Sequence, residues 1–67
     1  MTTAKVIEII GCSEKSFDDA TKTAIAEAAK TLRGLKAAWI KDQSLCIKDN
    51  KIAQYKVILK VTFEVNH

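Results

Sequence analysis

The residues best suited to bind a ligand lie around the single tryptophan of the chain, Trp39. Alternate side chains of an extended strand share one face, and a strand paired with it adds its own side chains to that face. An indole ring offers a flat surface for stacking, and ammonium and amide groups offer hydrogen bonds. Two interpretations stay open: Trp39 packs between subunits, or it stacks on a planar ligand. The candidate ligand-binding residues are Ala37, Trp39, Lys41, Gln43 and Lys56.

Residue sets that perform catalysis or hold a metal are not recognisable in the sequence. His67 is the only histidine and the last residue, so no Ser-His-Asp or Cys-His arrangement is expected in the folded body. Cys12 and Cys46 are the only cysteines, and they do not form a C-x-x-C pair that would suit zinc. We therefore expect a protein that is not an enzyme and has no metal site.

The charge pattern argues against nucleic acid and membrane partners. The net charge is +3, and the lysines are spread along the chain without an arginine-rich run, whereas nucleic-acid-binding domains concentrate positive charge on one face. No apolar stretch reaches the roughly 20 residues that a membrane span requires. Without a signal peptide, and with two cysteines that we expect to remain thiols, the predicted location is the cytoplasm.

Four elements are predicted from hydrophobic periodicity and from end signals. A β-branched strand covers about residues 4–10 and is followed by a polar turn at 12–15. A helix is expected over 17–33, a second strand over 37–48 and a third over 52–65. The third strand alternates apolar and polar residues along its whole length, which is typical of a sheet with one buried face.

The predicted helix carries signals at both ends. Ser16 is a good N-cap, and Asp19 completes an approximate capping box. Gly34 is expected to end the helix in the left-handed conformation. Small residues dominate its apolar stripe, so the helix backbone should lie close against a sheet. That stripe consists of Phe17, Ala20, Ala24, Ile25, Ala28 and Leu32.

These elements predict one α+β domain over residues 1–67 with the order β-α-β-β. The last two strands form an antiparallel hairpin, and the first strand pairs with the free edge of the third. The result is a three-stranded antiparallel sheet of order 1-3-2 with one helix across one face.

The predicted lengths favour assembly with other copies of the chain. The third strand, at roughly 3.3 Å per residue, spans on the order of 45 Å. The helix, at 1.5 Å per residue, spans only about 25 Å. One helix cannot cover the apolar face of that strand, and an uncovered apolar strand promotes aggregation. We therefore expect a homo-oligomer.

Three segments resemble the dodecin family: VIEIIGCS at 6–13, SFDDA at 16–20 and YKVILKVTF at 55–63. The resemblance extends over essentially the whole chain, with Cys12 at a position where dodecins commonly have threonine. It implies a β-α-β-β subunit in a hollow homododecamer that binds and stores a small ligand without catalysis. The leading ligand implied by the resemblance is a flavin, riboflavin or FMN.

The signature residues of flavin-binding dodecins are replaced in this chain. The resemblance places the tryptophan that stacks on the flavin ring at Ala37, and the glutamine that hydrogen-bonds the ring at Lys56. Trp39 lies one pleat repeat, about 7 Å, along the strand from Ala37 and is a candidate to stack from a shifted position. Lys56 and Lys41 are candidates to attract a flavin phosphate or another anion.

The alternative is a dodecin-like assembly that does not bind flavin and has a structural or ion-binding role. Some dodecin-like proteins without the tryptophan are linked to cations. The acidic candidates here have no spacing that resembles a calcium loop. They are Glu8, Asp42, Asp49 and Glu64.

Overall fold

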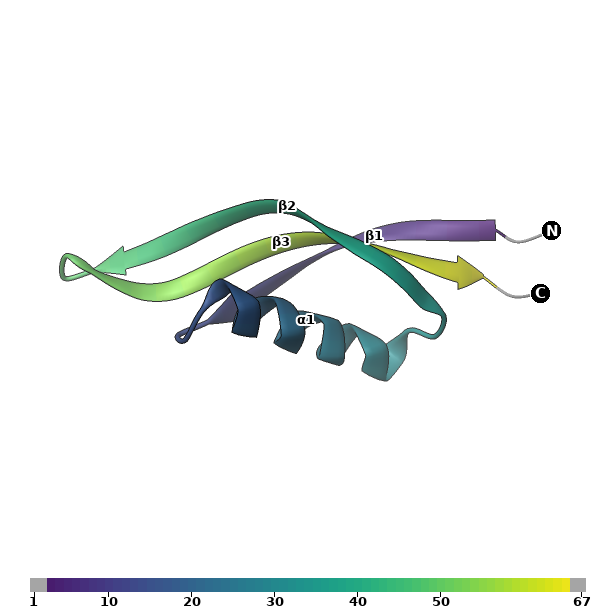
Figure 1. The fold of residues 1–67 in the computed structure, drawn as a ribbon, viewed down its shortest axis with the longest axis horizontal. Coiled ribbons are helices and arrows are strands. Elements are labelled where there is room, and N and C mark those ends of the chain that lie inside the picture. The colour runs from purple at the N-terminus through teal and green to yellow at the C-terminus, as the bar shows by residue number, and fades with distance from the viewer. Residues whose placement is uncertain (1–2, 66–67) are drawn as a thin grey trace.

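The structure is a computed structural model that describes residues 3–65, so His67 lies outside the described residues. The elements are β1 (Thr3–Ser13), α1 (Phe17–Thr31), β2 (Leu35–Lys48) and β3 (Lys51–Val65). Both strand pairings are antiparallel, and the sheet order is β1-β3-β2. The helix lies along one face of the sheet (Figure 1). The predicted α+β class, element order and strand order are confirmed.

The connection from β1 to α1 is shorter than the sequence indicates. β1 continues to Ser13, which lies opposite Tyr55, so the predicted turn beginning at Cys12 is wrong. The hydroxyl of Ser13 donates to Asp19 Oδ2 at 2.6 Å and accepts from the backbone N–H of Lys15 at 2.9 Å. These bonds tie the end of β1 directly to the first turn of the helix.

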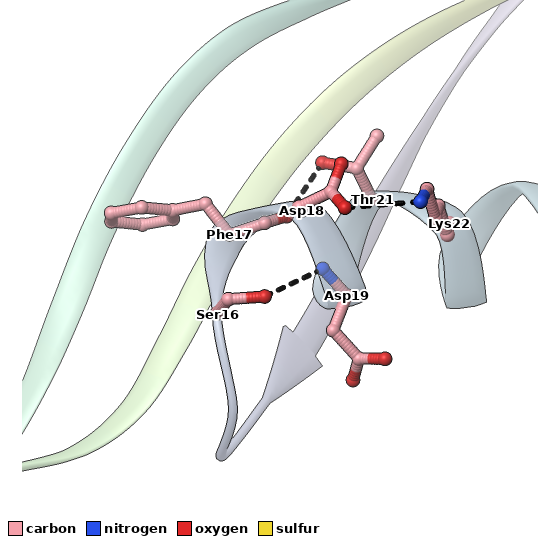
Figure 2. Close-up of polar contacts among 6 residues, drawn as sticks. All are labelled: Ser16, Phe17, Asp18, Asp19, Thr21 and Lys22. Atoms are coloured by element: carbon pink, nitrogen blue, oxygen red, sulfur yellow. Dashed lines mark hydrogen bonds and ion pairs between the residues drawn. The ribbon is translucent and has the colours of Figure 1, made fainter.

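Ser16 caps the N-terminus of α1 as predicted, whereas the Asp19 carboxylate accepts from Ser13 instead of completing a capping box. The backbone N–H of Asp19 donates to Ser16 Oγ at 2.9 Å, which satisfies one of the free donors of the first turn (Figure 2). The hydroxyl of Thr21 donates to the Phe17 carbonyl at 2.8 Å. Phe17 itself points toward the hairpin and meets Tyr55 edge-to-face, with ring centroids 5.1 Å apart.

The helix ends two residues before the predicted position. Its last residue is Thr31, and Leu32 is already extended. Gly34 therefore does not cap the helix, although it has the expected positive φ of 73°. Its carbonyl accepts a hydrogen bond of 3.0 Å from the backbone N–H of Glu64. Gly34 thus fixes the start of β2 against the end of β3.

A two-residue turn joins β2 and β3. Asp49 and Asn50 both have positive φ, 53° and 61°, which these two residue types tolerate better than most. Lys48 and Lys51 face each other across the turn. The hairpin tip extends past the N-terminus of α1 (Figure 1).

The core lies between α1 and the two strands beneath it. Val57, Leu59 and Val61 of β3 are fully buried there, as is Ala20 of the helix, and Ala24 is 8% exposed. The alanines allow the helix to lie close against β1, as the sequence predicts, and the closest approach is at Gly11. A Cβ atom on Gly11 would lie 2.6 Å from the Ala20 carbonyl oxygen and 2.8 Å from the Ala24 Cβ.

The helix packs on β1 and β3 and leaves β2 uncovered except at Leu35, which packs against the core. The apolar face of β3 is covered better than its length suggested, because Tyr55 and Phe63 are half-buried. Exposed apolar area lies mainly on β2 and on the face of the sheet that points away from α1. Its large side chains are Val6, Ile10, Trp39, Ile40, Leu45, Ile47 and Ile52.

The subunit is elongated for its size. It measures 52 × 19 × 13 Å, and its radius of gyration is 13.8 Å, whereas a compact chain of this length has about 11 Å. Its accessible surface is 5052 Å², against about 4200 Å² for a folded monomer of equal mass. No helix in the described part of the chain is long and apolar enough to cross a membrane.

Candidate functional site

The candidate site is the face of the sheet that points away from α1, which we call the open face. Directly paired residues of antiparallel strands point to the same side. Because Val57, Leu59 and Val61 point to α1, the residues between them in β3, and their partners in β1 and β2, point to the open face. Its central members are Glu8, Ile10, Cys12, Ala37, Trp39, Asp42, Ser44, Lys56, Ile58, Lys60 and Thr62.

Trp39 lies in a row of three residues that crosses the sheet. It is opposite Lys60 of β3, and Lys60 is in turn opposite Glu8 of β1. The Trp39 side chain remains 49% exposed in the isolated subunit. An indole with this exposure, on a sheet face without a helix, has a free surface on which a planar group can stack.

A β-bulge in β2 separates two of the predicted site residues. The pairing shifts between Ile40 and Asp42, so Lys41 is the extra residue. Gln43 consequently lies opposite the buried Val57 and points to the same side of the sheet as α1. The prediction that Gln43 shares a face with Trp39 is therefore wrong, because the bulge reverses the alternation along the strand.

Lys41 reaches across the open face rather than standing free. Its Nζ lies 3.0 Å from Glu8 Oε1 of β1, on the far side of the central strand. Both side chains are about half exposed, so the pair adds little stability. The geometry still matters for the site, because the charge of Lys41 is balanced within the subunit.

Ala37 and Lys56 both lie on the open face but far apart. Ala37 is opposite Thr62, whereas Lys56 lies between Cys12 and Ser44. The six residues from Lys56 to Thr62 correspond to about 20 Å along the strand. One subunit therefore does not bring Ala37 and Lys56 to the same aromatic ring, and a site that contains both needs a second subunit.

On the open face, Lys60 was missed as a candidate, and Glu8 was considered only for a cation. Lys60 is the direct neighbour of Trp39, and Glu8 is the partner of Lys41. The alternation of β3 already places Lys60 on the face of Lys56, so that signal was present in the sequence. The Glu8–Lys41 pair depends on the bulge and on the 1-3-2 strand order together.

The acidic side chains do not form a metal site within the subunit. Glu8 pairs with Lys41, and Glu64 lies 3.8 Å from Lys36. The carboxylate of Asp42 accepts from the backbone N–H of Gln43 at 2.9 Å. Among residues 3–65, no three side chains of histidine, cysteine, aspartate or glutamate come close enough together to hold a cation.

Two hollows in the subunit surface lie away from Trp39. One, of about 340 Å³, lies between β1 and α1 around Gly11 and Ala28. The other, of about 450 Å³, lies near the hairpin around Glu14 and Cys46. Trp39 lines neither of them. A ligand stacked on Trp39 would therefore need a second surface to cover its other side.

Comparisons with known proteins agree over the whole chain. A family model described as Dodecin matches residues 3–66. A Dodecin of Thermus thermophilus is 34% identical over 61 residues, which are 91% of this chain and 88% of that protein. A solved variant of a T. thermophilus dodecin superposes with a TM-score of 0.95 at 31% identity and covers 100% of both chains.

A third similar protein is named for the cation that it binds. The calcium dodecin of Mycobacterium tuberculosis is described as a calcium-chelating antigen with a calcium-binding site. It superposes with a TM-score of 0.85 at 29% identity and covers 96% of this chain and 91% of its own.

Proposed function

Because this chain belongs to the dodecin family, whose members are oligomers that bind small ligands, we propose that it binds and stores a flavin between subunits of a hollow homo-oligomer. Riboflavin and FMN are the leading ligands, and storage requires no catalytic step. Twelve subunits is the number that the family suggests. Two free thiols suit a reducing compartment, so we place the assembly in the cytoplasm.

The observation that carries this proposal is Trp39 on the open face. The indole is half exposed, and its face of the sheet has no helix over it. It is the only tryptophan of the chain, so it is the side chain best able to replace the stacking group that is absent at Ala37. A second subunit packed against the open face would enclose a ring held there.

A flavin titration tests this proposal. Riboflavin and FMN should lose fluorescence when the wild-type protein is added at micromolar concentration, because a stacked indole quenches the flavin. Trp39→Ala should abolish the quenching, and Trp39→Phe should retain part of the binding. Gln43→Ala is the matched control, because Gln43 lies on the same strand but points to the other side.

Two outcomes would contradict the proposal. One is flavin emission that does not change with wild-type protein. The other is equal binding by the wild type and Trp39→Ala, which would show that the ligand lies elsewhere. Native mass spectrometry of protein taken directly from cells adds an independent readout, because it reports the subunit number and any retained flavin together.

The second candidate function is binding of a cation by an assembly of the same fold. The calcium dodecin among the similar proteins supports it, as does the loss of both signature side chains at Ala37 and Lys56. A cation site would have to combine carboxylates of two or more subunits. Calcium-dependent melting together with metal analysis tests it, and a melting temperature that ignores calcium would contradict it.

A further inference from the structure

We draw no further inference here: the strongest candidate, the row of exposed apolar side chains at Ile40 and Leu45 on the side of β2 that faces α1, would serve association between copies of the chain, which restates an established property of the dodecin family.

Discussion

Leu59 and Ile40 face each other on neighbouring strands, on the same side of the sheet, yet their surroundings differ completely. Leu59 lies beneath α1 and is 1% exposed, whereas Ile40 on β2 is 46% exposed. The helix α1 covers β1 and β3. The strand β2 also carries large apolar side chains, but no helix covers them beyond Leu35. The contrast separates a half of the chain that buries its apolar side chains from a half that leaves them exposed.

The exposed apolar side chains limit the stability of a single copy of the chain. Burial of apolar area stabilises a fold by roughly 25 cal/mol per Å², and seven large apolar side chains among residues 3–65 are exposed. A monomer of this size has little stability to lose. The buried core lies under α1, whereas β2 and the open face leave apolar area exposed, which is the surface that we propose for association and for a ligand.

The largest loss of stability is expected when a buried side chain under α1 is truncated. Leu59→Ala removes a fully buried side chain, and such changes cost about 2–5 kcal/mol. That loss should lower the denaturation midpoint at every protein concentration tested. Chemical denaturation followed by circular dichroism measures it. A variant that retains wild-type stability would show that the core under α1 does not carry the fold.

A smaller loss of stability is expected from a substitution at Gly11, where the helix lies closest to the sheet. In Gly11→Ala the new methyl would lie 2.6 Å from the Ala20 carbonyl oxygen, so α1 must move away from β1. Overpacking of this kind costs about 1–3 kcal/mol. Cys12→Ala is the control, because the neighbouring side chain points to the open face. Equal denaturation midpoints for the two variants would contradict the close packing described here.

A substitution of Ile40 on β2 should weaken association between subunits and leave the folding of the subunit nearly unchanged. Ile40→Ala is expected to weaken association by about 1–2 kcal/mol per subunit, because less apolar area is available for burial between subunits. Dilution monitored by light scattering should show dissociation at higher concentration than in the wild type. If Ile40→Ala dissociates at the same concentration as the wild type, β2 is not an association surface.

The smallest effect in this series belongs to the helix cap. Ser16→Ala removes the acceptor of the Asp19 N–H bond and should lower stability by about 1 kcal/mol. Ser16→Asp retains an acceptor and should restore most of the loss. Thermal unfolding at one fixed subunit concentration measures both variants. An alanine variant as stable as the wild type would mean that the cap contributes nothing.

Much of the covered half could be predicted from the sequence. The alternation of β3 and the alanines of the helix are local patterns that indicate a strand with one buried face and a helix packed closely on it. The 1-3-2 order is the simplest arrangement, in which β1 pairs with the free edge of β3. The small residues of the helix stripe predict that the helix lies close to the sheet, but they do not identify Gly11 as the point of contact.

The uncovered half was harder to predict, because its arrangement depends on contacts between distant residues. A bulge at Lys41 has no sequence signal, yet it moves Gln43 to the side of α1 and aims Lys41 at Glu8. The end of the helix at Thr31 depends on how Gly34 meets Glu64 of β3. Which ligand the open face holds depends on a second subunit and therefore stays a proposal.

The claim that the subunit is incomplete alone is tested most directly by sedimentation of the wild-type protein at low micromolar concentration. We expect a single folded species whose mass is a multiple of the 7.4 kDa chain, with the Trp39 emission of a shielded indole. A uniform, stably folded particle of one chain mass, with Trp39 open to solvent, would contradict the account.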